Sequence, residues 1–460
     1  MSGIKNMLAI GAILPLLGIL ALDAAGETKA AQEGNQPTLT NVVRLLESGR
    51  DPVRIVCFGD SITGVYYHTG GRRAWGDMLG IALQQTYPRA KLELYNAGIS
   101  GDTTTKGLAR IDRDVLARKP HLVVVMFGMN DCTAANPRVF QDNLKTIVQR
   151  CRESGAAVVL CTPNSIYPED KTRFANLPSC VDAVRAVAAE MPVPMADCFL
   201  AYENLRASDP LAWKLLMSET IHPCMNGHRL FAQIIVEAIS GKKTVLDNVS
   251  PPSPALTFTF DRLSRKQPVN LIAMPPYDTI MPKVLRTIYP NAVIDITPWP
   301  TGALGEMEKW SKGIREKKPA LVVVAIPANA QSANDETFIR SYNWILSWSL
   351  AFGVAQWDTI AILPSVTQPN LTGGESRFAD LAQRVVAGRD IGFVERAARD
   401  GSEPEAILQR WTKTQHKSWT AMQGGHTRTV GGGSAAPPLI VPFLAEQRHD
   451  KQNEPSSTQP

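Results

Sequence analysis

The sequence lacks any block of like charge. Its 48 Lys and Arg residues are interleaved with 43 Asp and Glu residues, so the formal net charge at pH 7 is only +5 over 460 residues. Proteins that bind nucleic acid usually gather basic side chains in one run or on one face. The composition, with 44% hydrophobic and 20% charged residues, is that of a soluble globular protein. Nucleic acid is therefore not expected as a partner, and the chain length favours two domains.

Cysteine is absent from the second half of the chain, and the sequence contains no Cys-x-x-Cys motif. The seven cysteines fall at positions 57, 132, 151, 161, 180, 198 and 224. No clustered His and Cys spacing suggests a metal site, so we expect neither a metal nor a cofactor. An odd number leaves at least one thiol free even where export permits disulfides. Cys57 and Cys161 lie inside apolar runs, which favours small buried hydrophobic side chains at both positions.

The apolar run near the N-terminus, Met7–Leu22, is short for a transmembrane helix and contains Pro15. Lys5 precedes it and the small residues Ala24–Gly26 follow it, which is the pattern of a signal peptide. No cysteine lies near this boundary, which argues against a lipoprotein. We therefore expect residues 1–25 to be cleaved on export to the periplasm or the medium, leaving no stable membrane span. An uncleaved anchor is the alternative.

Strand-like and helix-like segments alternate through the first half of the chain. This alternation predicts an α/β fold, a three-layer parallel sheet covered by helices on both faces. His121–Phe127 is the strongest buried strand, because all but its first residue are apolar. The other strands are expected at Arg54–Phe58, Leu92–Tyr95 and Ala156–Cys161, and the helices at Leu39–Ser48, Trp75–Tyr87, Thr104–Ala117, Phe140–Ser154, Val181–Glu190 and Asn226–Ile239.

The second half resembles a worn copy of the first. Tyr87-Pro88 is matched by Tyr289-Pro290, and KPHLVVV at Lys119–Val125 is matched by KPALVVV at Lys318–Val324. The matching segments keep their order and lie about 200 residues apart, which favours duplication over coincidence. The polar motifs of the first half are missing from the copy, where AMPPYDT and AIPANA stand in their places.

These patterns predict the domain organisation. We expect an N-terminal linker and short helix over residues 26–51, and a first α/β domain over residues 52–240. A linker should follow over residues 241–268, with one strand at Ala255–Phe260, and then a second, degenerate α/β domain over residues 269–412. Residues 413–460 are expected to form a flexible tail, in which the apolar stretch Leu439–Leu444 is able to dock.

Three polar motifs of the first half follow predicted strands or precede a predicted helix. Gly59-Asp60-Ser61 comes directly after the first strand, and Gly128-Met129-Asn130-Asp131 follows the strongest one. The carboxyl ends of parallel strands are where clefts of open α/β sheets form. A serine there can act as a nucleophile, and an asparagine can donate to a developing oxyanion. Each motif also has a structural explanation as a turn or a helix cap, which fits Asp131 better than Asn130.

The third motif is ETIHP, in which His222 precedes Pro223 just before the last predicted helix of the domain. A residue before proline adopts an extended conformation, so His222 can reach across the mouth of a cleft. A neutral imidazole can accept the proton of Ser61 and return it to a leaving group. His121, His228 and the three histidines near the C-terminus fit structural or surface roles.

The order of the motifs resembles the SGNH (GDSL-like) serine hydrolase family. Its blocks correspond here to GDSIT at Gly59–Thr63, NAGISGDTT at Asn96–Thr104, GMND at Gly128–Asp131 and ETIHP at Glu219–Pro223. The stretch NAGISGDTTTKGLARI is similar to the lysophospholipase and acyl-thioesterase branch, and many exported members resemble carbohydrate esterases. The resemblance covers about residues 52–240 and implies a flavodoxin-like sheet, with a degenerate SGNH-like domain behind it.

The resemblance also implies the role of each site residue. Ser61 would be the nucleophile and His222 its base, while the backbone N–H groups of Ser61 and Gly101 and the side chain of Asn130 would form the oxyanion hole. Gly59, Asp60, Gly128 and Asp131 would support them. The family has Asp three residues before the His, whereas this chain has Glu219. A carboxylate preserves the essential chemistry, so we expect activity to be retained. The extra methylene shifts the carboxylate oxygens, and a misplacement of that kind can reduce the rate. Asp182 or Asp197 acting instead is the alternative.

The sequence therefore predicts an exported carboxylic ester hydrolase that passes through an acyl-serine intermediate. Acetyl or other short acyl esters of a small molecule or polysaccharide are one candidate substrate class, and lysophospholipids or thioesters are the other. Tyr66, Tyr67, His68 and Gly70-Gly71 follow the serine and are candidates to line the acceptor side. The alternative is a binding or scaffold protein with a weakened site. The oligomeric state is left open.

Overall fold

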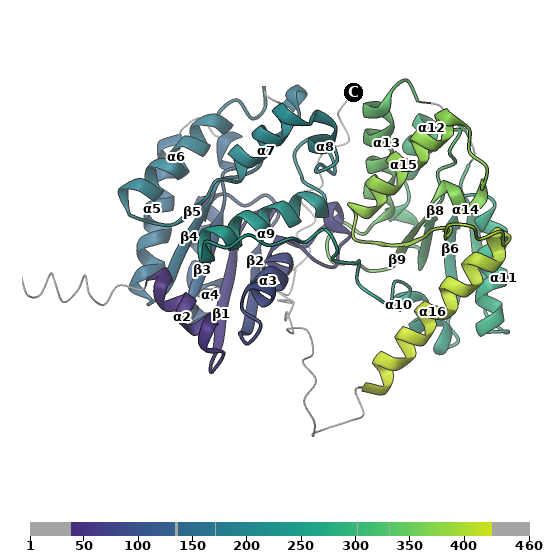
Figure 1. Ribbon diagram of the computed structural model, residues 1–460, viewed down its shortest axis with the longest axis horizontal. Coiled ribbons are helices and arrows are strands. Elements are labelled where there is room, and N and C mark those ends of the chain that lie inside the picture. The colour runs from purple at the N-terminus through teal and green to yellow at the C-terminus, as the bar shows by residue number, and fades with distance from the viewer. Residues whose placement is uncertain (1–37, 134–136, 171, 301, 331, 426–460) are drawn as a thin grey trace, which may run out of the picture.

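Each half of the chain forms a five-stranded parallel sheet (Figure 1). A computed structural model describes residues 38–425 except 134–136, 171, 301 and 331. The first sheet has the order β2-β1-β3-β4-β5 and the second has the order β7-β6-β8-β9-β10. The strands are β1 (Pro52–Gly59), β2 (Lys91–Gly98), β3 (Leu122–Met126), β4 (Ala157–Cys161), β5 (Met195–Ala196), β6 (Val269–Ala273), β7 (Ile294–Pro298), β8 (Leu321–Val324), β9 (Asp358–Ile362) and β10 (Gly392–Val394).

Helices cover both faces of each sheet. In the first domain these are α2 (Leu39–Ser48), α3 (Trp75–Thr86), α4 (Thr104–Asp114), α5 (Pro137–Glu153), α6 (Leu177–Glu190), α7 (Cys198–Ser208), α8 (Pro210–Lys214) and α9 (Met225–Ser240). In the second domain they are α10 (Thr257–Ser264), α11 (Tyr277–Ile288), α12 (Leu304–Ser311), α13 (Asp335–Ser349), α14 (Pro364–Thr367), α15 (Gly373–Ala387) and α16 (Pro404–Gly425). Helices α3 and α9 pack together, while α5 and α6 pack on the other side of the first sheet. The predicted fold class, two successive parallel α/β domains, is confirmed.

The second sheet has the same strand order as the first, and the turns next to its strands are also alike. Lys119 and Lys318 both adopt the left-handed conformation, with φ of 48° and 44°. Tyr87 and Tyr289 both end a helix with nearly the same dihedral angles, and each accepts a hydrogen bond of 2.9 Å from the residue three positions later. The same turns therefore join equivalent elements, as duplication predicts.

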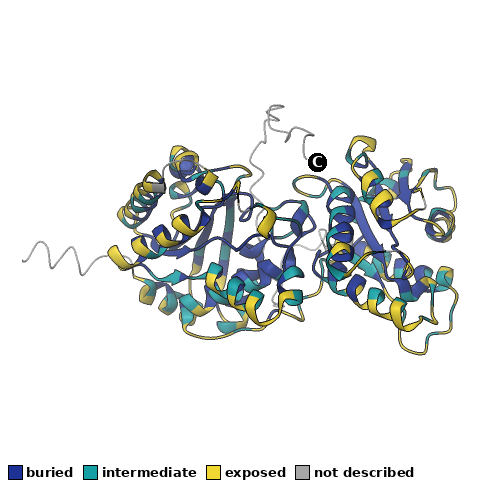
Figure 2. Ribbon diagram, turned by 90° about the horizontal axis from the view of Figure 1, so that it is seen from above, coloured by how far each residue is buried: buried dark blue, intermediate teal, exposed yellow. Residues whose placement is uncertain are grey.

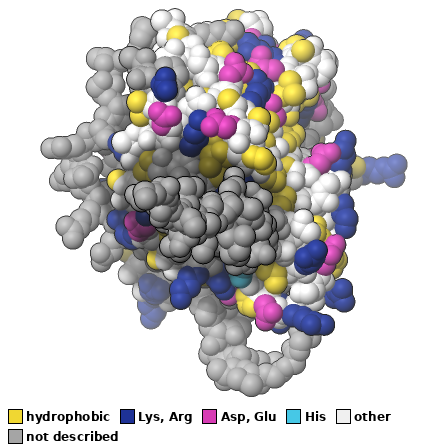
Figure 3. All heavy atoms as spheres, turned by 90° about the vertical axis from the view of Figure 1, so that its left-hand side faces the viewer, with side chains coloured by type: hydrophobic (Ala, Val, Ile, Leu, Met, Phe, Trp, Pro, Cys, Tyr) yellow, Lys and Arg dark blue, Asp and Glu magenta, His cyan; other side chains and the backbone are white. Residues whose placement is uncertain are grey.

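The apolar side chains form two separate cores, one around each sheet. Strand β3 is buried at all five positions, because helices cover both of its sides. The buried strands contrast with the exposed outer surfaces of the helices in Figure 2. On the face shown in Figure 3, the basic and acidic side chains that are not covered by grey atoms are intermixed.

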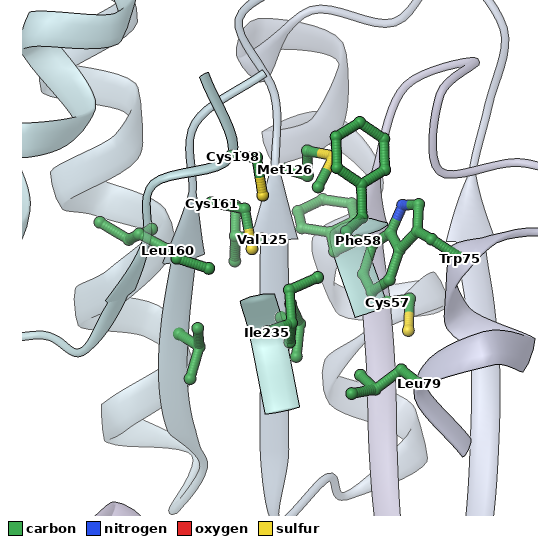
Figure 4. Close-up of a cluster of buried hydrophobic side chains, with 14 of the residues drawn as sticks. Cys57, Phe58, Trp75, Leu79, Val125, Met126, Leu160, Cys161, Cys198 and Ile235 are labelled. Carbon is green, nitrogen blue, oxygen red and sulfur yellow. The ribbon is translucent and has the colours of Figure 1, made fainter. Parts of the chain in front are cut away.

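All seven cysteines are buried as free thiols. Cys57 and Cys161 lie among apolar side chains of the first core, as predicted (Figure 4). Burial raises the pKa of the Cys57 thiol far above its ordinary value, so this thiol stays protonated and behaves as a small hydrophobic group.

Two predictions about the second half are wrong. The strand expected at Ala255–Phe260 is replaced by helix α10, in which Phe260 and Leu263 share the face that is buried in the second core. In so short an apolar run, helical and strand spacing look alike. The linker expected over residues 241–268 therefore contains the first helix of the second domain.

The tail predicted from residue 413 also starts too early, because α16 continues to Gly425. Trp419 is nearly buried against Phe260 and donates its indole N–H to Asp261 Oδ1 at 2.9 Å. The signal peptide over residues 1–25 and the apolar stretch Leu439–Leu444 lie outside the described residues. No helix in the described part of the chain is long and apolar enough to cross a bilayer.

Arg110 joins the carboxyl ends of β1 and β2. Its guanidinium donates to the carbonyl of Gly59 at 3.0 Å, to that of Ala97 at 2.8 Å and to the carboxylate of Asp102 at 2.7 Å. The side chains of Arg110 and Asp102 are only 8% and 9% exposed, so water contributes little to stabilising either charge. This ion pair holds the sheet edge in one geometry.

Arg110→Met should therefore lower the free energy of unfolding by about 3–5 kcal/mol, because Asp102 would stay buried without its cation. Arg113 is the matched control, since it pairs with Asp114 on the same helix but its side chain is 70% exposed. Arg113→Met should cost less than about 1 kcal/mol. Urea denaturation of both variants measures the difference, and equal losses would contradict this account.

Candidate active site

Ser61 lies in a tight turn at the carboxyl end of β1. The carbonyl of Asp60 accepts hydrogen bonds from the N–H groups of Thr63 at 3.2 Å and Gly64 at 3.1 Å, and its carboxylate accepts from Ile62 N–H at 2.9 Å. A side chain at position 59 would meet Met126 O at 2.3 Å, so only glycine fits between the turn and β3. The turn projects Ser61 from the sheet edge. Burial raises the pKa of the Asp60 carboxyl to about 7, so it is poorly suited to hold a negative charge.

His222 lies in a second turn, directly before α9. Ser218 N–H donates to His222 O at 2.9 Å, and Met217 forms an isolated antiparallel bridge with Pro223. This closed turn points the imidazole toward β1. His222 Nε2 lies 2.8 Å from Ser61 Oγ, across a separation of 161 residues in the chain. The distance is that of a nucleophile hydrogen-bonded to its base.

Glu219 contacts the other nitrogen of the same ring. Its Oε1 accepts a short hydrogen bond from His222 Nδ1 and a second one from His222 N–H at 2.9 Å. Oε2 accepts from Ile221 N–H at 3.3 Å and from the Thr220 hydroxyl at 3.2 Å. The turn's own donors thus hold the carboxylate, which removes the rotamer freedom that the extra methylene would otherwise add. Neither Asp182 nor Asp197 takes this place.

Those two aspartates have another partner. Arg185 donates to Asp197 at 2.9 Å and to Asp182 at 3.0 Å. Asp197 also caps α7 by accepting from Leu200 N–H. Their role is to order the region around β5 and α7.

The charges of Glu219 and His222 stabilise each other in a buried setting. Burial alone would lower the pKa of His222, but the charge and hydrogen bond of Glu219 outweigh it and raise the pKa above the ordinary 6.5. Burial would raise the pKa of Glu219, yet His222 and the backbone N–H groups bring it below its usual value. Glu219 is therefore ionised, and it favours the imidazolium that forms when His222 accepts a proton.

The expected oxyanion donors lie on the neighbouring loops. Gly101 has a φ of +73°, the left-handed region that favours glycine, and a Cβ there would meet nothing within 4 Å. A side chain at position 101 would therefore have room, but the backbone conformation would be strained. Asn130 Nδ2 donates to Asp102 O at 2.9 Å, which brings the amide beside the Gly101 loop.

Gly128 and Asp131, which were expected to support the site, shape the loops that carry Gly101 and Asn130. Gly128 has a φ of +124° at the end of β3, again a conformation that other residues rarely adopt. Asp131 Oδ1 accepts from both the N–H and the hydroxyl of Thr104, at 2.9 and 2.6 Å. Asp131 therefore anchors the first turn of α4, a helix that precedes it in the chain, and not the helix that follows it.

His68 is the residue whose place the sequence did not reveal. It was expected on the acceptor side, but it is 1% exposed. Its Nε2 lies 3.1 Å from the carbonyl of Ser61, which can only accept, so this nitrogen carries the proton. Its ring stacks on that of His222 with centroids 4.8 Å apart and planes inclined by 5°. Burial lowers the pKa of His68 far below its ordinary value, so the ring is neutral.

Comparison with known proteins agrees with this geometry. Residues 57–230 match the GDSL-like lipase/acylhydrolase family. This segment of the chain is therefore similar to that family. The resemblance stated from the sequence motifs is thereby confirmed for the first domain.

Individual relatives match parts of the first domain. An uncharacterised lipoprotein of Bacillus subtilis is 34% identical over 125 residues, which span 25% of this chain and 49% of the relative. An acetylxylan esterase of Geobacillus stearothermophilus is 27% identical over 172 residues, or 34% of this chain and 76% of the relative. Among solved structures, the lipase/acylhydrolase from Enterococcus faecalis is 27% identical and covers 42% of this chain and 100% of its own, with a TM-score of 0.37.

The Glu219–His222 pair leads to a prediction about pH. Below its pKa His222 is protonated and cannot accept the proton of Ser61, so kcat/KM should rise with pH through a pKa above 6.5. Glu219→Gln keeps the shape but removes the charge that favours imidazolium. It should move this acid limb to lower pH and reduce kcat by at least about a hundredfold.

The measurement is a pH profile of p-nitrophenyl acetate hydrolysis. Glu219→Asp is the control, because it keeps the charge on a shorter stem and should keep the acid limb near its wild-type position. A Glu219→Gln variant with unchanged kcat and acid limb would show that Glu219 does not orient the base.

Proposed function

We propose that the chain is a serine esterase in which Ser61 is the nucleophile and His222 the general base. Ser61 Oγ attacks the ester carbonyl carbon while His222 Nε2 takes the hydroxyl proton. The carbonyl oxygen becomes an oxyanion, which the N–H groups of Ser61 and Gly101 and the amide of Asn130 stabilise.

The tetrahedral intermediate then collapses. The bond to the alcohol oxygen breaks as His222 returns the proton to it, which leaves an acyl group on Ser61. Water enters, gives its proton to His222 and attacks the acyl carbon, and the carboxylic acid leaves with Ser61 Oγ reprotonated. Glu219 keeps its negative charge throughout and stabilises the imidazolium at both steps.

The observation that carries the proposal is the 2.8 Å contact of Ser61 Oγ with His222 Nε2, together with the Glu219 carboxylate on Nδ1. The turn after β1 and the turn before α9 thus bring these three polar side chains into contact. A fluorophosphonate probe tests the proposal directly, since it reacts with a serine only when a base activates it.

We expect the wild-type chain to be labelled at Ser61 and the Ser61→Ala variant to remain unlabelled. His222→Ala should slow labelling by about 10²–10⁴-fold, because the general base is lost. Mass spectrometry of the labelled peptide identifies the site. A folded wild-type chain that neither labels nor hydrolyses p-nitrophenyl acetate would favour the alternative, a binding or scaffold protein.

For the substrate, we propose an acetyl or short acyl ester of a carbohydrate. His222 must protonate the leaving alcohol, so the alcohol lies on the His222 side of Ser61. On that side the centroid of the Tyr67 ring lies 6.4 Å from that of the His222 ring. The centroid of the Phe352 ring lies 5.8 Å from that of the Tyr67 ring. Phe352 is 47% exposed, although it is a large hydrophobic residue beside a largely buried site. An exposed aromatic ring offers the flat apolar surface on which a sugar ring can stack, and one relative is an acetylxylan esterase.

This proposal predicts how Phe352→Ala changes specificity. For acetyl esters of methanol, glycerol, xylose and xylooligosaccharides, the variant should lose kcat/KM only for the sugars, by about 5–30-fold, which corresponds to one lost aromatic contact. Phe393→Ala, a half-buried aromatic on β10, is the control. Equal rates of the Phe352 variant and the wild type on all four alcohols would remove Phe352 from the acceptor side. Faster turnover of lysophospholipids or thioesters by the wild type would instead favour those substrates.

We further propose that the protein is exported. The support is the charged, apolar and small-residue order of residues 5–26, and the relative in Bacillus subtilis named as a lipoprotein. N-terminal sequencing of the protein recovered outside the cytoplasm would locate the cleavage site.

A further inference from the structure

Two segments of the first domain carry the reacting groups. We name residues 61–71 the nucleophile arm and residues 217–225 the base arm. Neither arm belongs to one of the two sheets. The nucleophile arm follows β1, and the base arm connects α8 to α9. Both arms pack against the second domain, and they do so through hydrogen bonds of main-chain groups rather than through apolar contact alone.

The nucleophile arm is bound to the loop after α13. Tyr67 N–H donates to Phe352 O at 3.0 Å, and Gly71 O accepts from Ala355 N–H at 2.8 Å. The second domain therefore holds the arm at two points after Ser61, Tyr67 and Gly71. A Cβ at Gly71 would lie 3.0 Å from Gly353 O, so the two backbones approach closely.

The base arm is bound at both of its ends. Asn343 Nδ2 donates to Met217 O at 3.2 Å, and Gly388 O accepts from Met225 N–H at 2.7 Å. Asn343 lies on α13 and Gly388 follows α15, so two elements of the second domain hold the turn that contains His222.

Arg389 joins the two arms. It is fully buried, and its guanidinium donates to His68 O on the nucleophile arm at 3.1 Å and to Ser218 O on the base arm at 3.5 Å. It also donates to Ser347 Oγ at 2.6 Å and to the carbonyl of Asn343. No carboxylate lies within ion-pair distance of it among the described residues. Burial lowers its pKa to about 10, so it still carries its charge at neutral pH.

A buried cation without a carboxylate is costly, and carbonyl groups are what offsets the cost here. Two of the three carbonyls that it binds, those of His68 and Ser218, belong to the two segments whose spacing decides whether Ser61 and His222 meet. The third, that of Asn343, lies on α13. His68 connects Arg389 to both reacting residues, because it donates to Ser61 O and its ring stacks on that of His222.

We infer that the second domain is a positioning half of the active site, and that Arg389 is the residue through which it sets the distance between nucleophile and base. This inference rests on the proposed reaction of Ser61 and His222 and goes beyond it. It gives the domain that lacks the serine motif a task in catalysis. Arg389 touches no reacting atom, so it is a positioning residue and not a catalytic one.

The test compares two arginines of the domain interface in the full chain. Arg389→Met removes the link between the arms. Arg72→Met is the matched control. Arg72 directly follows the nucleophile arm and also crosses the interface, but its guanidinium binds Asp358 at 3.2 Å and Pro254 O at 2.9 Å, which belong to neither arm. A displacement of about 1 Å in a reacting pair costs on the order of a hundredfold in rate.

We therefore expect Arg389→Met to lower kcat for p-nitrophenyl acetate by about 10–100-fold with KM unchanged, and to slow fluorophosphonate labelling of Ser61 in parallel. Arg389→Lys should recover part of kcat, because an ammonium can satisfy one arm but not both. Arg72→Met should keep the wild-type kcat whatever its melting temperature. Loss of kcat in both arginine variants in proportion to their loss of stability would mean that only domain docking matters, and would overturn the inference.

Should Arg389→Met fail to fold, Asn343→Ala answers the same question, since it deletes one bond to the base arm. A lower kcat with unchanged KM supports the inference, and a wild-type kcat overturns it. Failure of the proposed function is distinguishable, because in that case the wild-type chain itself would neither turn over nor label.

Discussion

The contact between Ser61 Oγ and His222 Nε2 joins two turns that the chain separates by 161 residues, and much of the first domain is arranged to permit it. Ser61 is held by the strand that precedes it. Strand β1 lies between β2 and β3, and it ends at Gly59, where only glycine fits against Met126. His222 has no strand beneath it. Its place depends on the turn closed by Ser218, on the start of α9, and on groups from the second domain. The first domain alone therefore constrains His222 less than it constrains Ser61.

The carboxylate behind the base illustrates how local geometry decides what a substitution costs. A glutamate in place of aspartate would be expected to swing with one more torsion. Here the N–H groups of Ile221 and His222 and the hydroxyl of Thr220 all point into the turn and bind both oxygens. A carboxylate that accepts several hydrogen bonds is fixed as well as ionised. The donors of residues 220–222 thus match the position of a glutamate carboxylate.

The sequence predicts much of this architecture because it reports burial and strand ends well. The apolar run of β3 and the motifs after β1 and β3 were sufficient to place Ser61 and Asn130 at one sheet edge, and the ordered repeats predicted the second sheet. What it could not reveal are partners far apart in the chain. Nothing near His68 indicates that it lies under His222, because a stack and one bond to a carbonyl leave no local pattern. Helix α10 was missed for a different reason, since its eight residues carry too few apolar positions to distinguish the two periods.

The degenerate second half raises the question of what keeps a fold after its reactive motifs are gone. Its strands and their turns have kept the geometry of the first half, down to the conformations of Lys318 and Tyr289. Packing explains that much, because both sheets need covered faces. Packing does not require a buried arginine, which an apolar side chain could replace at lower cost. Arg389 is explained if the carbonyls of His68 and Ser218 must be held, and these two lie one on each arm of the site. Arg389 and Asn343 thus bring polar groups of the second half to both arms of the site.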